Sequence, residues 1–301
     1  MSTVLITGSS TGFGRDGAER LARRGHQVVA TMRDVKERNQ AHRTALEKIA
    51  VSERLSLKVL EMDVTDEPSV QNAVDRAVAE FGRLDVVINN AGFGGIGITE
   101  AYTPEQFQSF FNVNVLGAVR VNRAALPHMR RQRNGLLIHV SSGNGRVVVP
   151  AMAAYSASKF ALEAVADAYR FELTPFGIES VLVEPGIYRT EIFDKLVAPA
   201  DAKRVADYGP QGGFAERILG TFVAALNAPG ASGSEEVAEA FVRLVEMDAG
   251  TRPFRTVVSA PVEQLLAPYN AAAEAVREII AQMFMVPELA DSSRVRSEPR
   301  P

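Results

Sequence analysis

Several residue types and patterns are missing from the 301-residue chain, and each absence excludes a class of site. There is no cysteine, so disulfides and thiolate metal sites are excluded. No apolar run approaches the ~18 residues that a membrane-spanning helix needs, so no membrane span is expected. A net charge of −3 gives no basic excess for sequence-independent nucleic-acid binding. No metal is expected either, because the four histidines have no ligand spacing and lie far apart, at 26, 42, 128 and 139.

What remains is ordinary for a globular protein. Apolar residues make up 46% of the chain and charged residues 23%, and the length is sufficient to bury a full core. The first apolar run starts within a few residues of Met1, which leaves no room for a signal peptide. Together with the lack of cysteine, this predicts a cytoplasmic protein.

Short apolar runs alternate with helical segments up to about residue 185. This rhythm predicts an α/β fold, a single-domain, doubly wound parallel sheet with helices on both faces, covering residues 1–286. Strands are expected near 3–7, 27–32, 56–61, 84–89, 135–141, 178–184 and 254–259. Helices are expected near 13–24, 36–51, 67–82, 104–132, 152–175, 235–248 (with Ser234 as a possible N-cap) and 262–284.

Two segments depart from this rhythm. Residues 187–233 mix apolar side chains with glycine and proline, which predicts an insertion of short helices that covers the substrate. A structural excursion or a dimer contact is the alternative. Residues 287–301 are polar and contain several prolines, so a flexible C-terminal tail is expected.

The most informative pattern is Tyr155-x-x-x-Lys159, with Ser142 thirteen residues earlier. Positions four apart share one face of a helix, so the phenol and the ammonium are expected side by side. A neighbouring cation favours phenolate and lowers a tyrosine pKa from its reference value of about 10. An acid–base group acts best with a pKa near the working pH, and the pair is therefore predicted to transfer protons.

A glycine-rich turn lies between the first strand and the first helix. Its glycines, Gly8, Gly12 and Gly14, have the spacing Gly-x-x-x-Gly-x-Gly. Such a turn lets a phosphate approach the backbone N–H groups at a helix start. We therefore predict a dinucleotide site, with the pyrophosphate at this turn.

The end of the second strand bears on the choice of cofactor. An NAD enzyme places an acid there to accept from the ribose 2′-hydroxyl, but this chain has Met32, followed by Arg33. An arginine binds a 2′-phosphate through charge-assisted hydrogen bonds, which favours NADP(H) over NAD(H). Asp34 leaves an alternative open, since a small change of register would bring its carboxylate close, and Arg33 could also be a plain surface residue.

These motifs occur together and in order, and the chain resembles the short-chain dehydrogenase/reductase family over residues 3 to about 190. Within that family it is most similar to the branch with 17β-hydroxysteroid and retinol dehydrogenases, as Ala30 to Asp34 and the long C-terminal part suggest. The matching residues are Thr7-Gly8-x-x-x-Gly12-x-Gly14, Asp63, Asn89-Asn90-Ala91-Gly92, Asn114, Ser142, Tyr155-x-x-x-Lys159 and Pro185-Gly186.

The resemblance implies an NADP(H)-dependent oxidoreductase that moves a hydride between nicotinamide and a carbonyl or secondary alcohol. Tyr155 would be the acid–base group, Lys159 would lower its pKa and hold the nicotinamide ribose, and Ser142 would stabilise the substrate oxygen. Asn114 would hold a water that links Lys159 to solvent. Ser141 and Asn112 are the alternatives for the serine and the asparagine.

The implied cofactor contacts run through the first 190 residues. Asp63 has an alternative as a turn residue. The expected set is Gly8, Ser9, Ser10, Thr11, Gly12, Phe13, Gly14, Arg33, Asp63, Val64, Asn90, Ala91, Gly92, Tyr155, Lys159, Pro185, Gly186 and Thr190.

Other functions compatible with a dinucleotide fold are less well matched. One is a catalytically inactive dinucleotide-sensing regulator, which usually lacks the tyrosine or the lysine. Another is a sugar-nucleotide epimerase or dehydratase of the related extended family, which has a differently spaced glycine turn. The family resemblance also implies a homodimer or homotetramer, joined through residues 104–132 and the helix that carries Tyr155.

Overall fold

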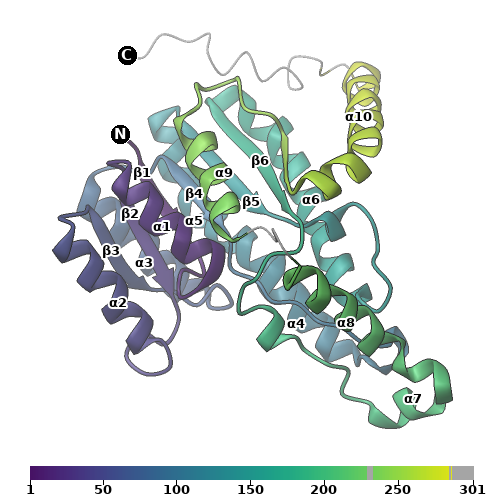
Figure 1. The fold of residues 1–301 in the computed structure, drawn as a ribbon. Coiled ribbons are helices and arrows are strands. Elements are labelled where there is room, and N and C mark those ends of the chain that lie inside the picture. Colours follow the sequence, from purple (N-terminus) through teal and green to yellow (C-terminus); the bar gives the residue numbers. More distant parts are fainter. Residues whose placement is uncertain (229–232, 285, 287–301) are drawn as a thin grey trace.

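The computed structural model describes residues 1–228, 233–284 and 286, and it contains one seven-stranded sheet (Figure 1). The strand order is β3-β2-β1-β4-β5-β6-β7, and every pair is parallel. All seven expected strands are therefore confirmed. Their bounds are β1 Thr3–Ile6, β2 Gln27–Met32, β3 Leu57–Glu61, β4 Val86–Asn89, β5 Gly135–Val140, β6 Ile178–Pro185 and β7 Arg255–Val258.

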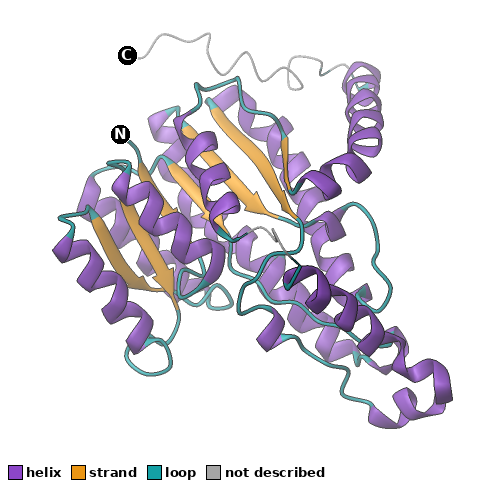
Figure 2. Cartoon of the chain, in the orientation of Figure 1, coloured by secondary structure: helices purple, strands orange, loops and turns teal. Residues whose placement is uncertain are grey.

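Helices cover both faces of the sheet, as Figure 2 shows. One apolar cluster joins α1, α2 and α9 to the sheet, and another joins α3 and α5 to its opposite face. The single doubly wound domain is confirmed. The long helices are α1 Gly12–Arg23, α2 Gln40–Ser52, α3 Glu67–Phe81, α4 Pro104–Asn114, α5 Leu116–Gln132, α6 Ala153–Leu173, α9 Glu235–Glu246 and α10 Ala260–Met283.

Three expectations about the helices were wrong in detail. The helix expected at 36–51 begins at Gln40, because the preceding residues form a turn around the Asp34 carbonyl. The single helix expected over 104–132 is two helices that meet at Val115, a one-residue break that hydrophobic periodicity does not detect. Ser234 does not cap α9 with its side chain, since its hydroxyl is bonded to Asp16 on α1.

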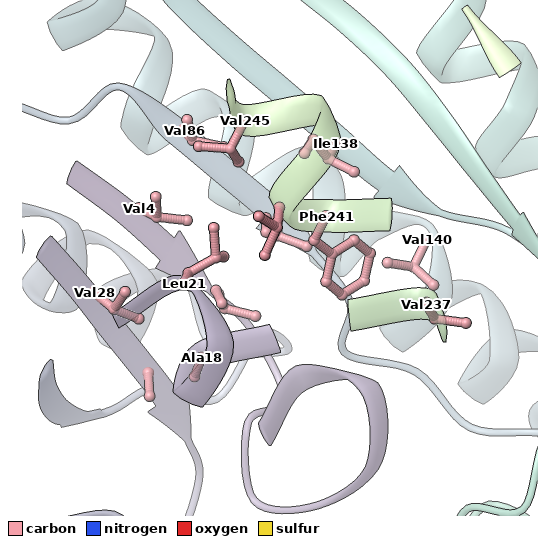
Figure 3. Close-up of a cluster of buried hydrophobic side chains, with 14 of the residues drawn as sticks. Val4, Ala18, Leu21, Val28, Val86, Ile138, Val140, Val237, Phe241 and Val245 are labelled. Atoms are coloured by element: carbon pink, nitrogen blue, oxygen red, sulfur yellow. The ribbon is translucent and has the colours of Figure 1, made fainter. Parts of the chain in front are cut away.

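The C-terminal part of the chain is built into the core of the first βα unit. Phe241 of α9 is fully buried and lies over α1, beside Leu21 (Figure 3). The close approach depends on Gly17, because a Cβ at that position would lie 2.8 Å from the Phe241 ring. Residues far apart in sequence thus fix the glycine-rich turn relative to the sheet.

The segment 187–233 leaves β6 and forms short helices, as expected. They are η4 Phe193–Lys195, α7 Ala202–Asp207, η5 Gly209–Gly213 and α8 Phe214–Leu226. Its first part lies along residues 94–97, where Gly95 and Val197 form a parallel bridge. The expected C-terminal tail falls at 287–301, outside the described residues. Within the described residues, no helix is both long and apolar enough to cross a membrane.

Candidate active site

The glycine-rich turn and the loop after β4 are bonded into one unit. The Thr7 hydroxyl accepts from the backbone N–H groups of Asn90 and Ala91, both at 2.9 Å. Gly8 has φ +67° and Gly12 has φ +56°, values that side-chain-bearing residues rarely adopt. The two loops that end neighbouring strands therefore form one rigid wall at the carboxyl edge of the sheet.

Close packing at this wall explains the third glycine of the motif. The Asn90 amide donates to the carbonyls of Thr7 and Gly8 at 2.9 and 3.1 Å. A Cβ at Gly14 would lie 2.5 Å from both that amide nitrogen and the Gly8 oxygen. Ser9 does not offer its hydroxyl to a ligand as expected, because the group is buried and donates to the Ile6 carbonyl.

A cleft of about 510 Å³ opens along this edge. Six of the expected residues do not line the cleft: Ser9, Gly14, Asn114, Ser142, Pro185 and Gly186. The other expected residues do line it: Gly8, Ser10, Thr11, Gly12, Phe13, Arg33, Asp63, Val64, Asn90, Ala91, Gly92, Tyr155, Lys159 and Thr190. Among the described residues, no group of three or more His, Cys, Asp or Glu side chains could hold a metal ion.

Two arginines, Arg33 and Arg38, line the cleft. Arg33 follows β2, and Arg38 also lines the cleft, although the sequence did not single it out. The turn responsible is centred on Asp34, with φ +51°, whose carbonyl accepts from the N–H groups of Glu37 and Asn39. The wrongly placed start of α2 concealed this turn, so Arg38 was read as a helix residue. Asp34 itself is not part of the lining.

Asp63 also lines the cleft and serves the turn after β3. Its Oδ1 accepts from the backbone N–H and the hydroxyl of Thr65, at 2.8 and 2.7 Å. Burial raises the pKa of this carboxyl, but the two Thr65 bonds and the nearby Arg33 and Arg120 charges outweigh it and leave the pKa lowered. Asp63 therefore both stabilises the turn after β3 and lines the cleft.

Tyr155 and Lys159 lie on one face of α6, with the lysine Nζ 5.7 Å from the phenol ring centre. The Nζ donates to the Val140 carbonyl at 2.7 Å instead of reaching the phenol. Burial raises the pKa of Tyr155, and a hydrogen bond with Ser142 only partly opposes this. The expected lowering by the lysine is thus wrong for the geometry seen here.

Lys159 is itself strongly perturbed. Burial lowers the pKa of its ammonium to about 8, while the charge of Glu163, one helical turn on, raises it. The ammonium therefore loses its proton at a pH where an ordinary lysine, with a pKa of about 10.4, is fully charged.

Two adjacent serines point to opposite sides. The Ser141 hydroxyl donates to Glu163 Oε1 at 2.8 Å, whereas the Ser142 hydroxyl lies on the Tyr155 side and acts to lower the pKa of the phenol. Ser142 also accepts from the Asn144 N–H at 3.2 Å, at the start of the turn η2 (Gly143–Gly145). Ser142 is therefore the serine beside the phenol, although Ser141 is the one of the two that lines the cleft.

Behind Ser141 and Lys159 lies a buried charge cluster that the sequence did not indicate. Glu163 and Glu184 both lie 3.2 Å from Nε of Arg255, and Glu163 lies 3.6 Å from Arg146. Asn270 of α10 donates to Glu184 and accepts from Arg146. Burial raises the pKa of both carboxyls. The cluster ties the turn after Ser142 to β6, β7 and α10.

Asn114 occupies the position expected of it, next to the lysine. A Cβ at Gly92 would lie 3.1 Å from Asn114 Oδ1 and 3.8 Å from Lys159 Nζ, so both groups face that glycine. The Asn114 amide donates to Ser158 and to the Phe93 carbonyl, which holds the β4 loop against α6. The alternative, Asn112, accepts from Arg120 instead.

Apolar side chains surround the outer side of Tyr155. One cluster joins it to the insertion, and a second joins it to α4 and the loop after β4. In these two clusters, the residues from the insertion, α4 and the loop after β4 are Phe93, Phe107, Val197, Leu196, Phe214, Ile218, Leu219 and Phe222. The polar cleft thus continues into an apolar region at the phenol.

Comparisons with known proteins agree with this geometry. A 3-ketodihydrosphingosine reductase of Bacteroides thetaiotaomicron is 39% identical over 64% of this chain, and the match spans 65% of the reductase's own length. Mouse 17-beta-hydroxysteroid dehydrogenase type 1 is 36% identical over 80% of the chain and 69% of its own length.

Solved structures and a family model extend the likeness. A short-chain dehydrogenase from Streptomyces avermitilis has a TM-score of 0.73 and 27% identity, covering 94% of this chain and 97% of its own. The sequence model described as short chain dehydrogenase matches residues 2–201, which include the glycine-rich turn, Ser142 and the Tyr155–Lys159 pair. The chain therefore belongs to the short-chain dehydrogenase family.

Proposed function

We propose that this protein is an NADP(H)-dependent oxidoreductase that interconverts a ketone or aldehyde and an alcohol on a hydrophobic substrate. One observation carries the proposal: Tyr155 lies where the cleft meets the apolar clusters, with the Ser142 hydroxyl beside it and Lys159 on the same helix face. A substrate oxygen at that point would meet two hydroxyls, and the rest of the molecule would meet apolar side chains.

Each polar side chain then has a defined task. Bound nicotinamide would supply or accept the hydride. Tyr155 would give its proton to the substrate oxygen in reduction, and the raised pKa keeps the phenol protonated for that step. Ser142 would donate to the same oxygen and stabilise its developing charge. Lys159 would place a positive charge near the phenol, and Asn114 would hold a water beside Lys159 as a proton path.

The residues of the cleft fit a phosphorylated dinucleotide. Gly8 and Gly12 leave the start of α1 open to a pyrophosphate, and no side chain caps the first N–H groups of that helix. Arg33 and Arg38, which also line the cleft, suit a 2′-phosphate, since guanidinium groups pair with phosphate oxygens. One similar solved structure is titled as a complex with NAD and another as a complex with NADP. The choice of NADP(H) over NAD(H) for this protein therefore rests on the two arginines.

The substrate class follows from the apolar region. Phe214, Ile218 and Leu219 of α8 pack in the cluster that contains Tyr155, so the insertion covers the phenol. Relatives are named for ketosphingoid, steroid and retinol substrates, which agrees with an apolar alcohol or ketone. A cytoplasmic homodimer or homotetramer, joined through α4, α5 and α6, remains part of the proposal.

Replacing Tyr155 with phenylalanine should abolish turnover while leaving NADPH affinity nearly unchanged, because the ring still packs but has no proton to pass. NADPH oxidation can be followed at 340 nm with a panel of sphingoid, steroid and retinoid ketones and aldehydes, and binding by quenching of NADPH fluorescence. Near-full turnover in Tyr155→Phe would assign the proton to another group. NADPH binding without turnover in the wild type would favour the inactive sensing protein.

Arg33→Ala and Arg38→Ala should each weaken NADPH binding far more than NADH binding. A charge-assisted bond to phosphate is worth roughly 1.5–3 kcal/mol, so each loss should be about ten- to a hundredfold. Titration of both cofactors into each variant measures this, with Arg130→Ala, an exposed arginine of α5, as the matched control. Equal losses for NADPH and NADH would contradict the assignment of a 2′-phosphate site.

The insertion 187–233 should exchange amide hydrogens faster in the free protein than in a complex with NADPH and substrate. Its first part is bonded to residues 94–106, but α8 packs on the body through side chains of the cluster around Tyr155, which a substrate would displace. Hydrogen–deuterium exchange with mass spectrometry on both forms measures the difference. Strong protection of this segment in the free protein would make it a fixed structural element rather than a lid.

A further inference from the structure

The last helix, α10, has an unusual distribution of polar and apolar side chains. It has 24 residues, of which only Leu266, Arg277 and Ala281 are buried. In Figure 1 its C-terminal part stands as a column beside the body of the protein. Seven of its exposed side chains, counting the residue that ends it, are large and apolar: Leu265, Tyr269, Val276, Ile279, Ile280, Met283 and Phe284.

Polar groups attach this helix to the body. Glu274 forms two parallel bonds of 3.0 Å with Arg170 of α6 and also pairs with the buried Arg277. Asn270 joins the charge cluster behind Ser141 through Arg146. A surface helix of a monomer normally turns its apolar stripe to the core and its charges to solvent. In α10 the arrangement is reversed.

The exposed apolar residues also have a regular spacing. Tyr269, Ala272, Val276, Ile279 and Met283, here called the outer seam, are alternately three and four residues apart, and all five are exposed. This is the a/d spacing of a heptad repeat, in which each side chain packs between side chains of a second helix. The seam begins directly after Pro268, the internal proline of α10, so no proline interrupts it.

We propose that the outer seam binds the same seam of a second copy of this chain, as a two-helix coiled coil. The positions that flank the seam are uncharged, namely Ala273, Ala275, Ile280 and Gln282. Charges at these positions usually select a different partner, and here an identical helix meets no repulsion. The small alanines also permit close approach of the two backbones.

A membrane surface fits the helix less well. The charged residues of α10 are Glu263, Glu274, Arg277 and Glu278, and its one arginine is buried against Glu274. Helices that lie on anionic lipid carry Lys or Arg on their polar face. The excess of glutamate would be repelled by such a surface.

The area available is adequate for a dimer contact. The exposed fractions of the seven large side chains add up to about four fully exposed side chains. At the 150–250 Å² of an aromatic side chain, which exceeds the area of the five aliphatic ones, the upper limit for the area under a second helix is roughly 600–1000 Å² per copy, against about 800 Å² per partner in a standard interface. This contact is distinct from the one through α4, α5 and α6, so a protein that uses both would be a tetramer.

Sedimentation equilibrium of the whole protein across a hundredfold range of concentration tests the pairing. Ile279→Glu places two buried carboxylates in each pair of seams, so the mass of the largest species should fall by half. Val51→Glu makes the same change at an exposed valine of α2 and should leave the mass unchanged. A wild-type monomer, an unchanged mass for Ile279→Glu, or an equal loss for Val51→Glu would each overturn the proposal.

Cross-linking gives a second readout that does not depend on a disruptive variant. The chain has no cysteine, so Val276→Cys introduces a single thiol at the middle of the seam. A short bismaleimide should join two Val276→Cys chains in high yield and should leave Val51→Cys uncross-linked. The absence of a covalent dimer for Val276→Cys, at concentrations where the wild type self-associates, would show that another surface forms the oligomer.

Discussion

The site depends on one buried positive charge, the ammonium of Lys159. Its Nζ is held by the Val140 carbonyl at the end of β5, and the nearest acid on its own helix is Glu163. Burying a charge is costly unless it is paired and hydrogen-bonded. The Val140 carbonyl and the charge of Glu163 offset only part of this cost, because burial still leaves the pKa of the ammonium lowered to about 8.

The buried charge cluster around Glu163 connects distant parts of the chain to the chemistry. Arg146 follows the turn after Ser142, Arg255 lies on β7, and Asn270 lies on α10. The C-terminal helices therefore do more than complete the domain. Phe241 of α9 fixes the glycine-rich turn, and Asn270 of α10 fixes the turn that presents Ser142 to Tyr155.

The sequence predicted the sheet and most of the site because both depend on local signals. Seven apolar runs separated by helical segments are sufficient for the strands, and glycines with positive φ mark the turn at Gly8 and Gly12. The predictions that failed depend on the direction of a side chain or on contacts between residues far apart in the sequence. Ser9 has the same chemistry as Ser10 but turns inward to the Ile6 carbonyl. The helix break at Val115 and the turn at Asp34 each involve only one or two residues. Because the turn at Asp34 was not predicted, Arg38 was not recognised as a residue of the cleft. The cluster around Glu163 joins residues up to 124 positions apart, and no local pattern predicts it.

The central claim, that the site is built around a buried ammonium with a lowered pKa, can be measured directly. The chain has only six lysines, so the ¹⁵N signals of their side chains can be followed through a pH titration by NMR and assigned with Lys159→Met. The account predicts one lysine with a pKa near the value of about 8 set by burial, and its signal should be missing from Lys159→Met. The other lysines should titrate near the ordinary value of about 10.4. If all six titrate near the ordinary value, Lys159 is not held in a dry site, and the claim of a buried ammonium at the centre of the site is contradicted.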